Sequence, residues 1–212
     1  AFDKTFSTEK YSVLSISDLQ DLSGYTAEII EANFIYILPS NVAVKDVVIT
    51  EIFPDPSPSV GLQESEFVEI YNRTDNAVNL SEWSVTDGSS VATLPDVLFL
   101  PKEYLVLTND VNDTLGFDKA IYLQDFPSLN NSEDMLIIKD GKGETIDSIN
   151  YSLAWYRDNN EAQGGWTLEI IDPDNICSGH ENWSASESNT GGTPGFTNSL
   201  TGSNPAPAGP QL

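Results

Sequence analysis

The sequence predicts an all-β protein built as a sandwich of sheets. Short apolar runs rich in Val, Ile, Tyr and Phe recur along the chain, about ten residues apart, and Asn, Asp, Gly and Pro separate them. No window keeps apolar residues at the i, i+3, i+4, i+7 spacing of an amphipathic helix. This pattern favours a sandwich, because a parallel α/β sheet needs helices between its strands.

The apolar runs give the expected strands in chain order. They are Tyr11–Ser17, Ile29–Leu38, Val47–Phe53, Phe67–Tyr71, Trp83–Thr86, Tyr104–Thr108, Met135–Lys139, Thr145–Ile149 and Trp166–Ile171. Residues Ile16–Leu22 have room for one helical turn. The segment Asp140-Gly-Lys-Gly143 lies between two of the runs, and its glycines allow the positive φ that a tight turn needs. We therefore expect a β-hairpin there.

Composition shifts divide the chain. Residues 1–38 hold two or three strands, too few to close a core, so they form part of a domain. Residues 39–45 are a short linker, 46–199 the main domain, and 200–212 a Pro-, Gly- and Ser-rich linker. The chain begins at Ala1 with no apolar leader, which indicates a processed product or an excised piece of a larger protein.

The charge balance excludes several classes of partner. The chain has 33 acidic and 9 basic side chains among 212 residues, a formal net charge of −24. This charge repels the phosphate backbone of nucleic acids and the headgroups of anionic lipids. No stretch approaches the roughly 20 apolar residues of a membrane span. We expect neither nucleic-acid binding nor membrane insertion.

Cysteine and histidine each occur once, as Cys177 and His180. A single cysteine makes no internal disulfide. Cys177-Ser-Gly-His180 supplies two of the four ligands of a structural zinc site, and we interpret it as a loop. A Ser-His-Asp triad would need His180, but the sequence has no Gly-x-Ser-x-Gly elbow. We expect no catalytic residue, no cofactor and no bound metal.

The acidic residues suggest one alternative. Glu51, Glu66 and Glu69 lie on neighbouring predicted strands, and Asp55 begins the loop between them. Carboxylates from adjacent strands are ligands suited to calcium, and paired carboxylates can act as acid and base in a glycosidase. No Asp-x-Asp-x-Asp-Gly calcium loop is present. We favour a structural role in which Glu51 and Glu69 accept hydrogen bonds from loop amides.

The aromatic residues suggest a second alternative. Trp155, Trp166 and Trp183 flank loops rich in Asn, Asp and Gly. Exposed aromatic rings beside such side chains can bind a sugar ring, whereas buried ones close the end of a sandwich. We favour the packing role.

Ordered motifs across residues 47–199 resemble the lamin-tail domain in the bacterial form found in large secreted and surface proteins. The motifs are Val47-Val-Ile-Thr-Glu-Ile52, Asp55-Pro-Ser-Pro-Ser59, Glu66-Phe-Val-Glu-Ile-Tyr-Asn72, Val78-Asn-Leu-Ser-Glu-Trp83, Ser128-Leu-Asn-Asn-Ser132, Gly191-Gly-Thr-Pro-Gly195 and Asn198-Ser199. The resemblance implies an immunoglobulin-like β-sandwich that serves as an interaction module. It carries no catalytic residues, and Trp83 is similar to the family's core tryptophan.

The N-terminal segment is similar to the last strands of a bacterial immunoglobulin-like repeat. The resemblance lies in Lys10-Tyr-Ser-Val-Leu-Ser-Ile-Ser17, the turn Asp21-Leu-Ser-Gly24 and the strand that ends at Leu38. Its apolar surface needs a cover, which a homodimer through residues 1–38 would provide.

From the whole sequence we expect a non-catalytic extracellular or cell-surface module of a larger bacterial protein. Its partner would be a protein or glycan ligand at the cell surface. The alternative is a carbohydrate-binding module attached to a secreted enzyme.

Overall fold

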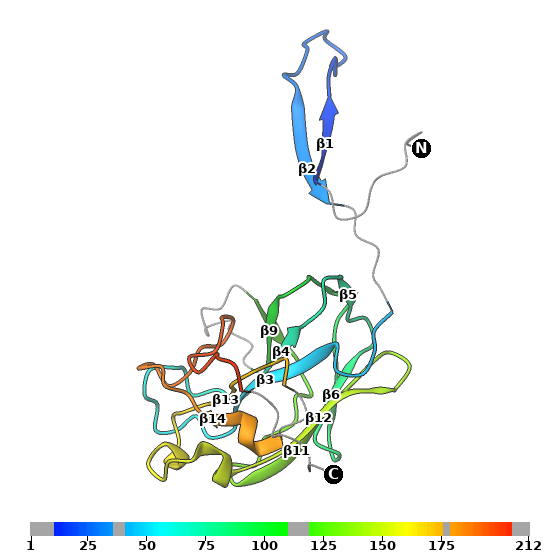
Figure 1. Cartoon of the computed structure of the whole chain (residues 1–212). Helices are drawn as coiled ribbons and strands as arrows, with labels where there is room; N and C mark the ends of the chain where they lie inside the picture. The colour runs from blue at the N-terminus through cyan, green and yellow to red at the C-terminus, as the bar shows by residue number, and fades with distance from the viewer. Residues whose placement is uncertain (1–10, 36–40, 110–118, 176–178, 205–212) are drawn as a thin grey trace. The chain divides into compact units, whose positions relative to one another are not determined.

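The computed structural model describes residues 11–35, 41–109, 119–175 and 179–204. The chain divides into two compact units, Ala1–Pro39 and Ser40–Leu212, which are described separately. Figure 1 follows the chain from blue to red. No helix in the described ranges is long and apolar enough to cross a membrane.

The N-terminal unit is an antiparallel hairpin of β1 (Tyr11–Ile16) and β2 (Ile30–Ile35). The helical turn expected at Ile16–Leu22 does not form, because Gln20 pairs with Thr26 and continues the ribbon. The Asp-x-x-Gly turn is present: the Asp21 carboxylate accepts the N–H groups of Ser23 and Tyr25, which lock the loop. Residues 36–38 of the expected second strand lie outside the described ranges.

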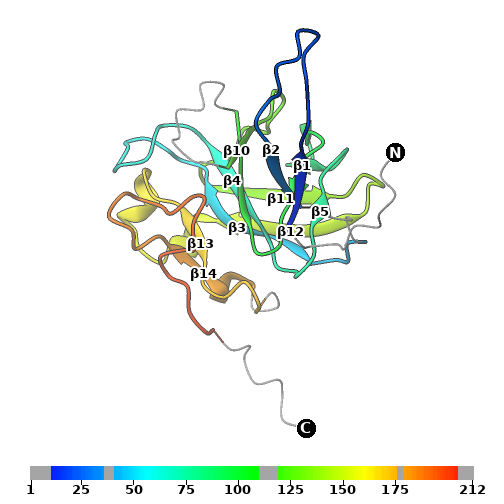
Figure 2. The same cartoon turned by 90° about the horizontal axis from the view of Figure 1, so that it is seen from above.

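The second unit contains two larger sheets and one short pair (Figures 1 and 2). The six-stranded sheet has the order β10 (Ala120–Tyr122), β9 (Tyr104–Thr108), β4 (Phe67–Asn72), β3 (Val47–Phe53), β13 (Leu168–Ile170) and β14 (Trp183–Ala185). The four-stranded sheet has the order β12 (Thr145–Ser152), β11 (Glu133–Lys139), β6 (Ser84–Thr86) and β7 (Val91–Thr93). The short pair is β5 (Val78–Asn79) with β8 (Leu98–Phe99). Short 3₁₀ helices cover Leu153–Tyr156, Glu161–Gln163 and Gly179–Asn182.

The main core lies between the two larger sheets, where alternate strand residues point inward. The six-stranded sheet contributes Ile49, Val68, Ile70, Leu107 and Ile170, and the four-stranded sheet contributes Val85, Leu136, Ile138 and Ile146. Trp83 is 3% exposed within this cluster, which confirms its predicted packing role. The protein is therefore an all-β sandwich, as the sequence predicts.

A bulge in β3 sets which residues face outward. The register between β3 and β4 shifts between Ile49 and Glu51, so that Thr50 is the extra residue. Beyond the bulge Glu51 lies opposite Glu69, on the face of the sheet away from the main core. On that face Phe53 packs on Phe67, with ring centroids 5.4 Å apart.

The predicted hairpin turn between β11 and β12 is confirmed. The Asp140 carboxylate accepts the N–H groups of Lys142 and Glu144, and Gly143 has a φ of +83°. All nine expected strands have counterparts in the structure; Val47–Phe53 and Tyr104–Thr108 keep the predicted bounds, and the other seven differ at one or both ends. The sequence analysis missed five short strands: β5, β7, β8, β10 and β14.

Candidate functional site

Three glutamates form a row across the outer face of the six-stranded sheet. Glu51, Glu69 and Glu169 lie on β3, β4 and β13, and each directly faces its neighbour in the strand register. All three are fully buried. Directly opposite residues in an antiparallel sheet have side chains about 5 Å apart, so this carboxylate row brings like charges together.

The carboxylate row holds a C-terminal strap, residues 191–200. Glu51 accepts the N–H of Thr193 at 2.9 Å, and Glu69 accepts the N–H of Gly195 at 2.6 Å. These bonds confirm the prediction that both glutamates accept hydrogen bonds from loop amides. The strap approaches closely: a Cβ on Gly192 would lie 2.6 Å from Oε1 of Glu51.

Glu169 and Asn198 complete the attachment. The Glu169 carboxylate accepts the hydroxyl groups of Thr193 (2.8 Å) and Ser199 (2.7 Å). The amide of Asn198 donates to the carbonyl groups of Thr50 (2.9 Å) and Ile170 (3.0 Å), which ties β3 to β13 beyond their last paired residues. Residues 198–200 thereby act as part of the sheet.

Burial disfavours the ionised forms of Glu51 and Glu69. Desolvation raises the pKa of Glu51 well above its usual value, and the charges of Glu69 and Glu169 add to the effect. Burial also raises the pKa of Glu69 to about 8. Oε2 of Glu51 is buried and has no partner among the described residues. A proton on this oxygen would remove an uncompensated buried charge.

Glu66, the third residue of the calcium and glycosidase alternatives, lies apart from this row. Its Oε2 accepts the N–H of Leu129 at 3.2 Å, and Leu129 belongs to the core between the sheets. Glu51 and Glu69 each bind the strap through one carboxylate oxygen, on the opposite face of the sheet. Within the described part of the chain, no group of three or more His, Cys, Asp or Glu side chains could hold a metal ion.

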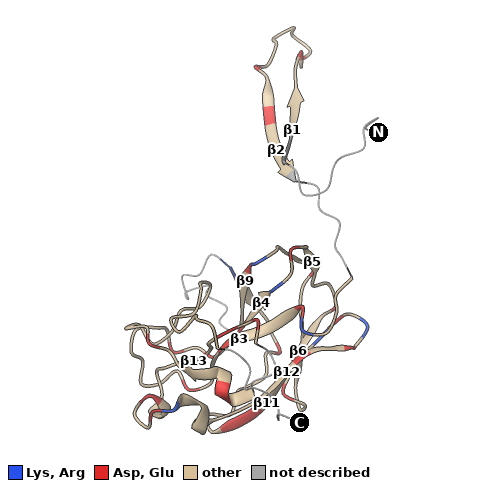
Figure 3. Cartoon of the chain, in the orientation of Figure 1, with Lys and Arg blue, Asp and Glu red and all other residues tan. Residues whose placement is uncertain are grey.

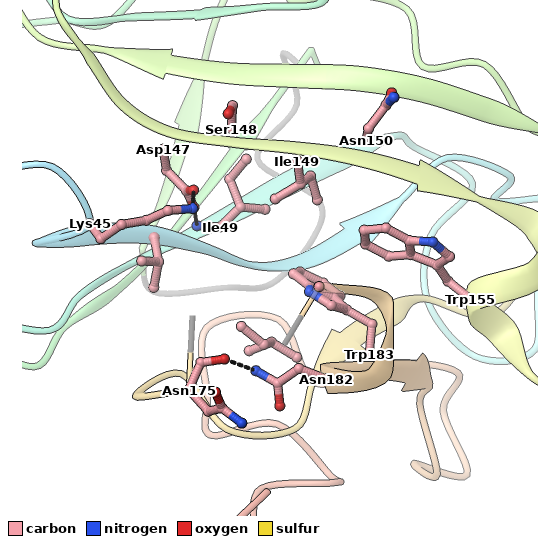
Figure 4. Close-up of a pocket in the computed structure, with 13 residues that line it drawn as sticks. Lys45, Ile49, Asp147, Ser148, Ile149, Asn150, Trp155, Asn175, Asn182 and Trp183 are labelled. Carbon is pink, nitrogen blue, oxygen red and sulfur yellow. Dashed lines mark hydrogen bonds and ion pairs between the residues drawn. The ribbon is translucent and has the colours of Figure 1, made fainter. Parts of the chain in front are cut away.

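A pocket of about 240 Å³ lies between the two sheets (Figure 4). Its volume is below the roughly 300–1,000 Å³ of typical ligand pockets, so it has the size for one ring or a few side-chain atoms. It is lined by Lys45, Val48, Ile49, Asp147, Ser148, Ile149, Asn150, Trp155, Ile170, Asn175, Gly179, Asn182 and Trp183. The strands β3 and β12 form two of its sides.

A buried ion pair closes one end of the pocket. Asp147 is 2% exposed and forms an ion pair with Lys45. The other carboxylate oxygen of Asp147 accepts the N–H of Ile49 at 2.7 Å. Removing the half-buried Lys45 would leave the charge of Asp147 buried and without its ion-pair partner, so this pair holds β12 against the start of β3. Because Lys45 and Asp147 pair with each other, neither offers an unpaired charge to a ligand in the pocket.

Two tryptophans close the other end. Trp155 and Trp183 have ring centroids 5.8 Å apart, with their planes inclined by 41°. Trp183 is buried and Trp155 is half-buried, whereas Trp166 is half-buried and lies outside the pocket lining. The structure thus brings together two of the three tryptophans singled out from the sequence, and most of their surface is used in packing.

His180 lies exposed in the 3₁₀ helix Gly179–Asn182, and Cys177 falls outside the described residues. The described residues therefore supply no further member of a Ser-His-Asp triad and no further zinc ligand beside His180.

Sequence reasoning missed Glu169, Lys45, Asp147 and Asn198. Glu169 carried a usable signal, because Thr50-Glu-Ile52, Val68-Glu-Ile70 and Leu168-Glu-Ile170 place the same charge at the same position in an apolar strand. Lys45 and Asp147 had none, since 102 residues separate them.

Two stacked sheets around one apolar core, with the buried acidic side chains used in internal hydrogen bonds, define an immunoglobulin-like β-sandwich domain. The family model of the Lamin Tail Domain matches residues 40–152, and the chain belongs to this family. The family is compatible with a non-catalytic structural or interaction role. No curated protein sequence matches the chain.

Proposed function

We propose that this chain is a non-catalytic interaction module of a larger extracellular or cell-surface bacterial protein. The observation that carries the proposal is the use made of buried acidic groups: Glu51, Glu69, Glu169 and Asp147 all bind structural donors. A catalytic carboxyl group must instead reach a substrate.

The charge distribution supports an extracellular role. Figure 3 shows acidic residues on many strands and loops, whereas Lys and Arg occupy a few places. A net charge of −24 keeps the module soluble and reduces non-specific association.

Two experiments test the proposal. Protease treatment of intact bacterial cells that make the parent protein should release peptides from this domain, and peptides released only after lysis would contradict the location. The purified chain should not hydrolyse glycosides or phosphoesters. Hydrolysis that is lost in Glu66→Gln would contradict the non-catalytic role.

The pocket between the two sheets, which Trp155 lines, favours a second candidate function, carbohydrate binding. Its size fits one sugar ring, and Asn150 supplies an exposed amide group on the same side of the pocket as the aromatic wall. A glycan array tests it, with Trp155→Ala as the pocket variant and Trp166→Ala as the matched control outside the pocket. Specific glycan binding lost only in Trp155→Ala would establish this candidate, and the absence of binding would remove it.

The N-terminal hairpin supports a further part of the proposal, a homodimer through residues 1–38. Ile16 and Ile30 are directly paired and are 41% and 51% exposed, so the hairpin does not cover this surface with its own residues. Light scattering should show a mass that rises with concentration and falls in Ile30→Lys. A monomer at all concentrations would contradict the dimer.

A further inference from the structure

The strand β12 presents an open backbone edge. In the four-stranded sheet it is the terminal strand, paired with β11 on one side. Leu153 and Ser132 face each other one position beyond the pair Glu133↔Ser152, and the Leu153 N–H donates to the Ser132 carbonyl at 2.8 Å. They are therefore a hydrogen-bonded pair of the ladder. Bonded and non-bonded pairs alternate along an antiparallel ladder. Ser148 and Asn150 therefore direct their N–H and C=O groups away from β11.

The outward groups of Ser148 and Asn150 border the pocket. Both residues belong to its lining, and Figure 4 shows β12 running along it from Asp147 to Asn150 with Trp155 beyond. No hydrogen bond to these outward groups occurs within the described ranges. One residue earlier along the chain from Asp147, the carbonyl of Ile146 already accepts the N–H of Lys45 at 2.8 Å. That bond shows that an outward backbone group of this edge can pair with the backbone of another segment.

On the side of the pocket formed by β3, side chains bind the backbone groups that have no partner strand. Where β13 stops pairing, Asp147 accepts the N–H of Ile49 and Asn198 donates to the carbonyl of Thr50. Side chains thus satisfy backbone groups on this side of the pocket, while those of Ser148 and Asn150 stay available. Natural sheets usually cover or charge such an edge, because it pairs readily with another chain.

We infer that the β12 edge binds an extended, basic segment of a partner protein as an added strand, with one apolar side chain in the pocket beside Trp155. This inference rests on the proposed interaction function and names its partner class. Main-chain hydrogen bonds would supply affinity, and the pocket would select one side chain.

Charge identifies the occupant. The chain has a net charge of −24, and the basic side chain in the pocket, Lys45, is already paired with Asp147. A second copy would bring the same excess of negative charge, so self-pairing at this edge is repelled. A segment with Lys or Arg beside its apolar residues is attracted.

The test uses the full chain and a fluorescein-labelled probe peptide of alternating Lys and Val residues with one central Phe. We expect saturable binding by fluorescence anisotropy, weakened by added salt. On addition of the peptide, NMR should show the largest chemical-shift changes at the backbone amides of Ser148 and Asn150. A peptide with Glu in place of Lys should not bind, and equal binding of that peptide would overturn the charge argument.

The pair Ser148→Pro and Ser148→Ala isolates the backbone contribution. Proline removes only the outward N–H, so the β11–β12 ladder keeps its bonds, and alanine retains the N–H. We expect Ser148→Pro to weaken probe binding about tenfold or more and Ser148→Ala to leave it unchanged. Equal binding by both variants, with unchanged circular dichroism, overturns the inference.

Trp155→Ala with Trp166→Ala as control tests the pocket by the same assay. About tenfold weaker binding in Trp155→Ala alone supports the inference. Glycan binding that is insensitive to Ser148→Pro, without peptide binding, would overturn it in favour of carbohydrate recognition. If the chain binds neither the peptide nor a glycan, the inferred β12 site is wrong. The proposed function fails on a different result, namely that the chain proves catalytic or intracellular.

Discussion

The two faces of the six-stranded sheet are buried in different ways by the same strands. The inner face is apolar, and residues such as Val68 and Ile70 pack against the second sheet. The outer face places Glu51 and Glu69 between those apolar positions and covers them with the strap, residues 191–200. A strand can therefore bury both faces with one large apolar core, provided that most polar groups on the other face find partners and that a carboxyl oxygen without one, such as Oε2 of Glu51, can take a proton.

The difference predicts distinct responses to change. Apolar burial is non-directional and depends on the area removed from water. The outer face depends on hydrogen-bond geometry and on the protonation of Glu51 and Glu69. Substitutions and pH should therefore separate the two faces.

The largest effect is expected on the inner face. Ile70→Ala removes a fully buried side chain and leaves a cavity, which should lower the free energy of unfolding by about 2–5 kcal/mol. Urea denaturation followed by tryptophan fluorescence measures this loss. A loss below that of the outer-face variants would contradict the assignment of the main core.

Gly192→Ala tests the closeness of the strap. The added Cβ would lie 2.6 Å from Oε1 of Glu51 and 2.7 Å from Cδ1 of Leu62, so either the strap or these packed side chains must move. We expect a loss of about 1–3 kcal/mol and faster proteolysis near the C-terminus, without loss of the inner core. Proteolysis at the wild-type rate would show that the strap is not tightly held.

The pH dependence of stability tests the carboxylate row. The pKa of Glu69 is raised from 4.5 to about 8, and the pKa of Glu51 is raised as well. Between these values the folded protein binds more protons than the unfolded chain, so the free energy of unfolding falls as pH rises. Urea midpoints should decrease from mildly acidic to mildly alkaline pH.

The control for this prediction is Glu51→Gln. The glutamine oxygen can still accept the Thr167 hydroxyl and the Thr193 N–H, but one titrating group is lost. We expect a shallower pH dependence in this variant. Midpoints that rise with pH in the wild type would mean that the row is stably ionised.

The smallest effect is expected for an exposed carboxylate. Asp174 has a side chain that is 84% exposed and forms an ion pair with Arg73 at 3.0 Å. Asp174→Asn should change stability by less than about 1 kcal/mol, because water and salt screen such pairs. A larger change, measured by the same urea titration, would remove the contrast between exposed and buried carboxylates.

The sequence predicts the fold well because each long strand is a recognisable run of β-forming residues. Val47–Phe53 and Tyr104–Thr108 were predicted with the bounds of β3 and β9, since each is a run of β-forming residues between turns. Strands of two or three residues, such as β8 and β14, are too short to show a pattern. Pairing partners elsewhere in the chain define them.

The site follows the same rule. The role of Glu51 and Glu69 could be predicted because a charge inside an apolar strand must find donors nearby. The pocket could not, because Lys45, Asp147 and Trp183 meet only after the two sheets stack. Their contacts depend on the topology, which local patterns do not encode.

The position of β13 has a consequence for the order of folding. The residues matched by the family model end at 152, yet β3 pairs on one side with β13, and Glu51 bonds to Thr167 across 116 residues. A contact at this separation forms late, so a growing chain must carry β3 as an open sheet edge. We expect Glu51 to be exposed to water during that interval, and a polar acidic residue on an edge strand discourages pairing with other nascent chains. The same carboxyl group that anchors the strap in the finished domain would thus protect the unfinished one from aggregation.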